Sequence, residues 1–213
     1  MPACIVVLAG VNGAGKSSVA GNAILKNGGR FFNPDDMARQ IRQNDPACPP
    51  AEANGLAWGL GRRGLERALA EGGFFAFETT LGGNTITALL LDGAGQQAEI
   101  HLSYIGLDSV ERHIERVSKR VAAGGHDIPE DTIRERYRTS RENLIKLIPH
   151  LSSLRVYDNS AETKSRPKPV LLLHMDKGTI KNHAPLERIP VWAKPLLTAA
   201  FRTNETRSGR RKK

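Results

Sequence analysis

The sequence predicts an α/β fold with a central, mainly parallel sheet flanked by helices. Strand-like and helix-like segments alternate along the 213 residues, as is typical of a parallel sheet. The apolar run Ile5–Ala9 leads into a glycine-rich loop and then into a helix-like segment, which is the strand–loop–helix order of a P-loop. We expect residues 1–201 to form one domain, because this length can bury a single core.

The glycine-rich loop reads Gly10-Val11-Asn12-Gly13-Ala14-Gly15-Lys16-Ser17, the pattern G-x-x-x-x-G-K-[ST]. Its glycines let backbone N–H groups face phosphate oxygens, and the N-terminal end of the next helix attracts the same anion. ATP or GTP fits this site. We expect Lys16 to reach the β- and γ-phosphates and Ser17 to hold Mg²⁺. The predicted nucleotide contacts are Gly10, Asn12, Gly13, Ala14, Gly15, Lys16, Ser17 and Ser18.

The remaining elements follow from apolar periodicity and from turn residues. The expected strands are Ala3–Ala9, Arg30–Phe32, Phe74–Phe77, Glu99–Tyr104, Leu154–Tyr157 and Val170–Leu173. The expected helices are 18–25, Asp35–Arg42, Pro50–Glu71, Thr85–Asp92, Ser109–Ala122 and Glu130–Ile148. The turn 176–179 predicts a hairpin, and Pro190 opens a short last helix. This hairpin and helix occupy about 168–201.

Composition excludes several classes of protein. No apolar run approaches the ~20 residues of a membrane helix, and the first strand lacks the basic flank of a signal peptide. Cys4 and Cys48 lie far apart without a C-x-x-C pattern, which argues against a disulfide framework or a zinc site and favours the cytoplasm. Much of the net charge of +9 lies in residues 202–213. We expect this basic segment to be disordered.

Two acidic segments follow predicted strands. Asp35 and Asp36 follow the second strand after Asn33 and Pro34, and Glu78 with Thr79 and Thr80 comes directly after the third. Ligands of open α/β sheets bind beyond the carboxyl ends of the strands. Phosphoryl transfer to a hydroxyl needs a carboxylate that orients it and accepts its proton. Either aspartate could do so. An aspartate before a helix can instead be its N-cap, so one of the two could cap the next helix while the other reacts. Glu78, Thr79 and Thr80 are expected to hold the acceptor.

An arginine-rich helix–loop–helix over about 116–140 has the character of a lid. Val110, Ile114, Val117 and Val121 form an apolar stripe, and a Gly-Gly hinge separates the two helices. Arginines in a lid stabilise charge on a transferring phosphoryl group, and lid closure excludes water. The candidate arginines are Arg112, Arg116, Arg120, Arg134, Arg136, Arg138 and Arg141.

Together these motifs resemble the zeta toxin family of P-loop kinases over roughly residues 3–160. The matching parts are Gly10–Ser17, Asn33-Pro34-Asp35, Phe77–Leu81 and Arg120–Tyr137. The resemblance implies a kinase-type P-loop fold and ATP- and Mg²⁺-dependent phosphorylation of UDP-N-acetylglucosamine on its sugar 3′-hydroxyl. It implies Asp35 as the catalytic carboxylate, ahead of Asp36, and Glu78 as a substrate ligand. Among the arginines, Arg120 and Arg136 match best, with Arg116 third.

The chain departs from long zeta toxins at His126, which falls near an expected arginine, and in its shorter length. A toxic member would need a separate antitoxin protein. Two other functions stay open. One is a housekeeping or resistance kinase for a nucleoside, an antibiotic or a sugar, and the other is a nucleotide-gated protein that binds nucleic acid through its basic tail.

Overall fold

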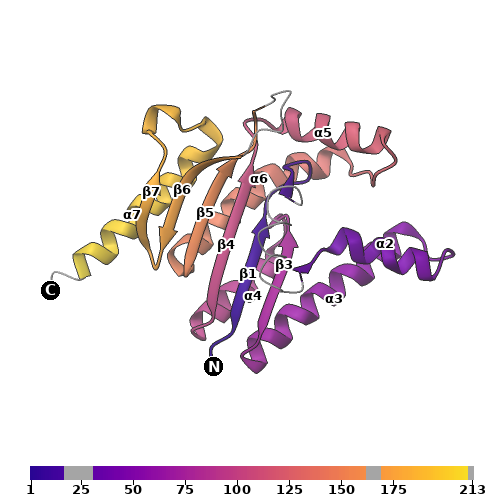
Figure 1. The fold of residues 1–213 in the computed structure, drawn as a ribbon, viewed down its shortest axis with the longest axis horizontal. Helices are drawn as coiled ribbons and strands as arrows, with labels where there is room; N and C mark the ends of the chain where they lie inside the picture. Colours follow the sequence, from indigo (N-terminus) through magenta and orange to yellow (C-terminus); the bar gives the residue numbers. More distant parts are fainter. Residues whose placement is uncertain (17–30, 162–168, 211–213) are drawn as a thin grey trace.

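The computed structural model describes residues 1–16, 31–161 and 169–210. Its centre is one seven-stranded sheet in the order β2-β3-β1-β4-β5-β6-β7 (Figure 1). The first five strands in this order are parallel, and β6 and β7 are antiparallel. The predicted mainly parallel α/β sheet is therefore confirmed.

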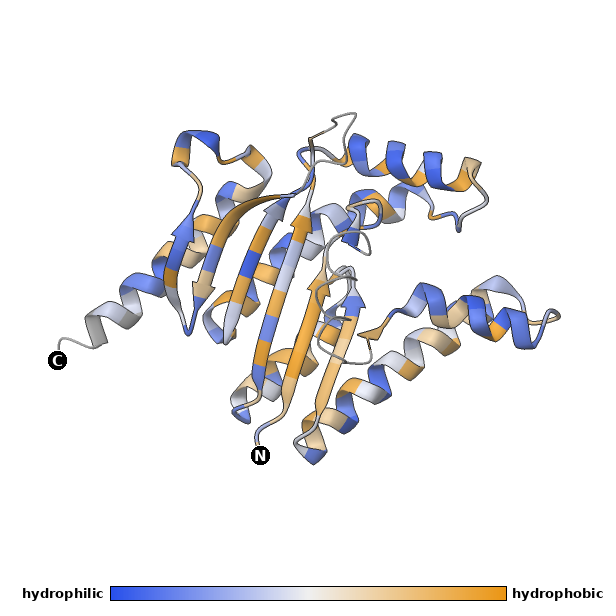
Figure 2. Cartoon of the chain, viewed as in Figure 1, coloured by the Kyte–Doolittle hydropathy of each residue, from blue (hydrophilic) through white to orange (hydrophobic). Residues whose placement is uncertain are grey.

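The parallel strands place their carboxyl ends at one edge of the sheet. They are β1 (Cys4–Ala9), β2 (Phe31–Phe32), β3 (Phe74–Thr79), β4 (Glu99–Gly106) and β5 (Ser153–Asp158). The P-loop leaves β1 at this edge, next to the ends of β3 and β4. Figure 2 shows the hydrophobic character of the central strands β1 and β3.

Four helices pack their apolar side chains against one face of the sheet. They are α3 (Pro50–Glu71), α4 (Asn84–Gly95), α6 (Glu130–Leu147) and α7 (Lys194–Arg210). Buried residues of these helices, such as Leu65, Leu90, Leu144 and Leu196, share one core with Ile5 and Val7 of β1. Among the described helices, none has the length and apolar character that a membrane-crossing segment needs.

Two helices and a glycine loop form the predicted lid region. In α5 (Val110–Ala122), Val117 packs with Ile133 of α6 and with Val11 of the P-loop, and Val110, Ile114 and Val121 border this cluster. The predicted apolar stripe is therefore the side by which α5 contacts α6 and the loop. The polar side of α5 faces away (Figure 2).

The C-terminal part differs from the prediction. The hairpin of β6 (Val170–Asp176) and β7 (Thr179–His183) forms as expected. Short turns follow at Leu186–Arg188 and Val191–Ala193, and then α7 runs to Arg210. The expectation that the chain is disordered from Arg202 is therefore wrong for residues 202–210. Packing explains the helix, since Thr203 is buried and the Asn204 Oδ1 accepts a hydrogen bond from the Ile180 N–H at 3.0 Å.

Candidate active site

A cavity of about 360 Å³ opens beyond the carboxyl ends of β1, β2 and β3. The P-loop contributes Asn12 and Lys16, and the start of α2 (Pro34–Asn44) contributes Asp35. Glu78, Thr79 and Thr80 line it from the end of β3, and Arg136 enters from α6. Seven predicted site residues from four separate segments thus line one cavity. Ser17 and Ser18 lie outside the described residues.

The P-loop glycines make approaches that a side chain would block. Gly13 has a φ of +80°, and a Cβ there would lie 2.6 Å from the His113 carbonyl oxygen. Gly15 has a φ of +84°, and its Cβ would lie 2.6 Å from the Asn159 Nδ2. The Asn159 Nδ2 donates to the Ala14 carbonyl at 2.8 Å. The loop is therefore held from one side by α5 and from the other by the segment after β5.

Lys16 is buried and points into the site. Its ammonium donates to the carbonyl oxygens of Gly10 at 2.7 Å and Val11 at 3.4 Å. It also lies 3.4 Å from the Glu78 carboxylate, and both side chains are about nine-tenths covered. The Asn33 Nδ2 donates to the other oxygen of Glu78 at 3.5 Å. Glu78 therefore contacts the P-loop lysine and the β2–α2 junction as well as the cavity.

The structure separates the two aspartates. Asn33 caps α2, because its Oδ1 accepts a hydrogen bond from the Asp35 N–H at 2.9 Å. Neither aspartate is the N-cap, so capping does not account for the carboxylate at position 35. Asp35 lines the cavity, whereas Asp36 pairs with Arg39 at 3.0 Å on the exposed surface and is absent from the cavity lining. The predicted substrate contact by Asp36 is therefore not supported.

Helix α6 fixes the loop that follows β3. The Ser140 hydroxyl donates to the Thr80 carbonyl at 2.6 Å, and the Asn143 Nδ2 donates to the Leu81 carbonyl at 2.9 Å. The Thr79 hydroxyl accepts a hydrogen bond from the Leu81 N–H at 3.1 Å. The hydroxyl groups of Tyr104 and Ser140 form a hydrogen bond of 3.0 Å, and burial raises the pKa of Tyr104 to about 12. This loop is therefore held rigidly beside the cavity.

Arg136 is the lid arginine that lines the cavity. It passes over Gly82, where a Cβ would lie 2.5 Å from the Arg136 Cγ. Its Nη1 donates to the Asn12 Oδ1 at 2.9 Å. Burial lowers the pKa of Arg136, and the nearby negative charge of Asp35 opposes that shift. The guanidinium and the Asp35 carboxylate therefore share one electrostatic environment.

The other two favoured arginines contact loop carbonyls instead. Arg120 donates to the His126 carbonyl at 2.7 Å and packs on Gly125. Arg116 donates to the Asn159 carbonyl at 2.9 Å. Neither lines the cavity in this structure. Arg120 thus stabilises the turn between α5 and α6, and Arg116 stabilises the segment that holds Ala14, so a direct catalytic role for them stays a prediction.

Several contacts of this site were not predicted from the sequence. His113 is buried beneath the P-loop, where its Nδ1 lies 2.8 Å from the Asn12 carbonyl oxygen. Asn33 and Asn159 hold Glu78 and Ala14. His126 lies 3.4 Å from Asn54 of α3 and lines the cavity. Asn33 and His126 belong to segments that the family resemblance singled out, but nothing in the sequence indicated these contacts. His113 and Asn159 lie in no motif, although His113 lies one residue before the predicted apolar position Ile114.

The burial of His113 makes stability depend on pH. Desolvation lowers the pKa of His113 from 6.5 to about 4. The unfolded chain takes up this proton below about pH 6.5, whereas the folded protein keeps the ring neutral, so stability falls as the pH falls through this window. From pH 7.5 to pH 5 we expect this group alone to lower the unfolding free energy by roughly 2 kcal/mol.

Urea unfolding at the two pH values checks this prediction. The variant His113→Asn should lose less stability than the wild type between pH 7.5 and pH 5. The variant His183→Asn, at an exposed histidine, should lose as much as the wild type. Equal losses in all three proteins would contradict the assignment.

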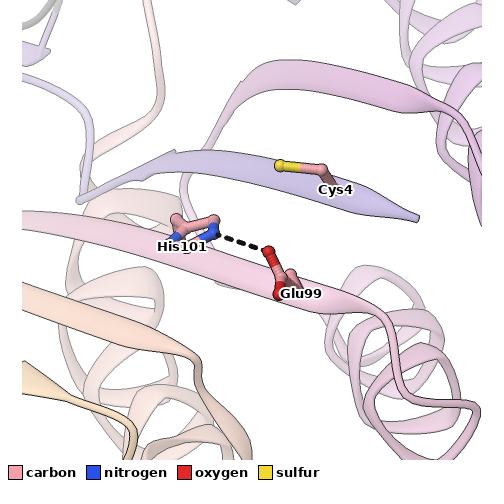
Figure 3. A group of neighbouring side chains, drawn as sticks. All are labelled: Cys4, Glu99 and His101. Carbon is pink, nitrogen blue, oxygen red and sulfur yellow. Dashed lines mark ion pairs between the residues drawn. The ribbon is translucent and has the colours of Figure 1, made fainter. Parts of the chain in front are cut away.

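A separate cluster of side chains lies at the amino ends of β1 and β4, away from the carboxyl ends that border the cavity. Cys4 pairs in register with Glu99, and Glu99 forms an ion pair with His101 at 3.8 Å (Figure 3). The thiol, carboxylate and imidazole ligand atoms lie within 4.8 Å of one another. Burial and the charge of Glu99 raise the pKa of Cys4. None of the three residues lines the cavity, so the cluster is not part of the candidate active site.

Comparison with known proteins supports the fold. No family model matches the chain. A chain of the AvrRxo1-ORF1:AvrRxo1-ORF2 crystal structure with sulphate ions is 15% identical with a TM-score of 0.63, over 96% of this chain and 75% of that one. A chain of the PezAT toxin–antitoxin system of Streptococcus pneumoniae is 14% identical with a TM-score of 0.55, over 96% of this chain and 87% of that one.

The fold is that of the α/β P-loop kinases. A related complex, AvrRxo1-ORF1:-ORF2, has been solved with ATP, and its chain has a TM-score of 0.62 and 15% identity over 94% of this chain and 64% of that one. In sequence, an uncharacterized protein of Haemophilus influenzae is 31% identical in an alignment of length 137 that covers 60% of this chain and 88% of that protein. The chain belongs to the same family as this Haemophilus influenzae protein.

Proposed function

We propose that the protein is an ATP- and Mg²⁺-dependent kinase that transfers the γ-phosphoryl group to a hydroxyl of a small molecule. One observation carries this proposal. The P-loop lysine, two acidic residues and a lid arginine, Lys16, Asp35, Glu78 and Arg136, line the same cavity. A protein that only binds a nucleotide needs the loop and its lysine, whereas two carboxylates beside them suit an acceptor hydroxyl.

Each side chain has a role that its position permits. Asp35 orients the acceptor hydroxyl and takes its proton. Glu78 releases Lys16 when a nucleotide binds, and it then accepts a hydrogen bond from the acceptor, with Thr79 and Thr80 beside it. Lys16 and Arg136 stabilise negative charge on the transferring group. Mg²⁺ would neutralise phosphate charge from a site at Ser17.

Replacement of Arg136 tests the role of the lid. We expect Arg136→Ala to lower kcat by about a hundredfold, the typical cost of removing one donor that stabilises transition-state charge. Arg138→Ala is the matched control, because Arg138 lies on the same helix and pairs with Glu142 at 3.0 Å on the surface. Steady-state kinetics of both variants should show the loss in the first variant alone. Equal kcat values for Arg136→Ala and Arg138→Ala would exclude Arg136 from the reaction.

For the acceptor we propose a sugar nucleotide such as UDP-N-acetylglucosamine, with the protein acting as the toxin of a toxin–antitoxin pair. The zeta-like motifs support this, as does the structural likeness to chains of AvrRxo1 and PezAT complexes. A separate antitoxin protein would then block the site. The alternative is a housekeeping or resistance kinase for another metabolite, nucleoside or antibiotic.

Expression in a bacterial host separates these alternatives. Wild-type protein should halt growth, and Lys16→Ala should restore it, if the protein is a toxin. A purified enzyme that phosphorylates UDP-N-acetylglucosamine should add one phosphoryl group to its sugar. Normal growth together with an unmodified sugar nucleotide would favour the housekeeping kinase.

A further inference from the structure

The wall of the cavity that α3 provides differs in chemistry from the rest. Asn54, Trp58, Gly61 and Arg62 line the cavity from α3. Their spacing of four, seven and eight residues places them on one side of the helix. Beside them lie Phe32, Ile86 and Ile128. The cavity thus has an aromatic and apolar wall as well as its charged groups.

Trp58 is 47% exposed although it lines the cavity. Other apolar residues of α3 are also exposed, such as Leu56 and Leu60, but these two do not line the cavity. A half-exposed indole inside a cavity offers a flat apolar surface to a ligand. Among the described exposed apolar side chains, this property distinguishes Trp58.

Arg62 adds a positive charge next to this surface. Its guanidinium carbon lies 5.7 Å from the centre of the Trp58 ring, and its Nη1 pairs with Glu66 at 3.0 Å. The Arg62 Nε has no hydrogen-bond partner within the described chain and is buried. The Nε is therefore closed to a ligand, but the side chain as a whole is 39% exposed, so its other guanidinium N–H groups can donate a hydrogen bond to a ligand oxygen.

The aromatic wall includes the end of β2, which leads into the helix that carries Asp35. Gly61 lets Phe32 lie against α3, since a Cβ at position 61 would be 2.6 Å from the Phe32 ring. Phe32 ends β2 and directly precedes Asn33, the cap of the helix that carries Asp35. A ligand on this wall would therefore lie close to the same chain segment as the proposed catalytic carboxylate.

We infer that this wall is a subsite for the planar heteroaromatic ring of the acceptor, with Trp58 as its stacking surface and Arg62 as a donor to a neighbouring phosphate or carbonyl oxygen. This inference rests on the proposed kinase function in that it treats the bound molecule as the phosphoryl acceptor. Binding of the ring itself can be measured without catalysis.

Intrinsic fluorescence gives a direct binding test, because the chain has two tryptophans, Trp58 and the buried Trp192. The protein is first saturated with a non-hydrolysable ATP analogue and is then titrated with uridine, cytidine, guanosine and adenosine monophosphates. Ribose 5-phosphate, which lacks the ring, is the matched ligand. At least one nucleotide should quench emission in the wild type and in Trp192→Phe, and ribose 5-phosphate should not.

Binding should also depend on the indole itself. Stacking on an aromatic side chain corresponds to about a tenfold change in affinity. Calorimetry should therefore show a nucleotide Kd about tenfold higher for Trp58→Leu, with affinity largely recovered in Trp58→Phe. Leu56→Ala, at an exposed residue of the same helix outside the cavity, should keep the wild-type Kd.

Any of three binding results would overturn the inference. The first is that no nucleotide binds to the analogue-saturated protein, and the second is that ribose 5-phosphate binds as tightly as the nucleotides. The third is an unchanged nucleotide Kd in Trp58→Leu. If the nucleotide binds through Trp58 but no acceptor is phosphorylated, the ring subsite stands and the proposed kinase function fails. If acceptors are phosphorylated and KM is unchanged in Trp58→Leu, the subsite fails and the kinase function stands.

Discussion

Lys16→Ala should abolish phosphoryl transfer, with a fall in kcat/KM of about a thousandfold. The Lys16 ammonium is buried at the cavity and lies between P-loop carbonyls and Glu78. No other lysine lines the cavity in the described part of the chain. Alanine leaves no group there to neutralise the β- and γ-phosphates during transfer. Coupled-assay kinetics at saturating ATP measure the loss.

The variant must be shown to fold, because it also removes the ammonium that lies 3.4 Å from the buried Glu78 carboxylate. Circular dichroism and thermal unfolding of Lys16→Ala provide that check. Lys181→Ala, at an exposed position on β7, serves as the matched lysine control and should keep wild-type kinetics. A folded Lys16→Ala variant with near-normal turnover would remove the P-loop lysine from the reaction.

Asp35→Asn should lower kcat by about a hundred- to ten-thousandfold, the range that one general base contributes. Asparagine keeps the size of the side chain but cannot take the proton of the acceptor hydroxyl. The hydrogen bond that caps α2 runs from the Asp35 backbone to Asn33, so it survives the substitution. The loss should therefore appear in kcat with little change in the unfolding temperature.

Asp36→Asn is a close control for this variant. Asp36 is the next residue of the same helical turn, and its carboxylate pairs with Arg39 outside the cavity. Its kcat should remain within about twofold of the wild type, because a surface ion pair contributes ~1 kcal/mol or less to stability and touches no substrate. A large loss in Asp36→Asn with an active Asp35→Asn would reverse the assignment of the two aspartates.

Most strands and helices could be predicted from local sequence patterns, because each of these patterns favours one kind of element. The apolar run before Gly10 and the helix Pro50–Glu71, which ends at Gly72 with a φ of +72°, match their predicted places. The end of α7 could not be predicted in this way. Its residues after Arg202 are polar, and their helix depends on contacts such as that of Asn204 with β7.

The candidate site was predictable where a side chain follows a strand, and less so where a helix must place it. Glu78 lies at the end of β3 and Asp35 follows the end of β2 by three residues, and the sheet fixes the position of both strand ends. The lid arginines cannot be told apart by residue type. Only tertiary packing directs Arg136 into the cavity and Arg120 onto the His126 carbonyl. His113 gave no signal, since its role depends on a contact with Asn12, 101 residues away in the sequence.

In the proposed reaction, the P-loop together with Asp35 and Glu78 transfers a phosphoryl group to a small molecule. Mass spectrometry of a bacterial metabolite extract incubated with ATP, Mg²⁺ and enzyme tests it most directly, with Lys16→Ala as the parallel reaction. We predict a metabolite that gains one phosphoryl group in the wild-type reaction alone, with UDP-N-acetylglucosamine the first to inspect. ATP consumption without any such phosphorylated metabolite, or an extract unchanged by either protein, would contradict the claim.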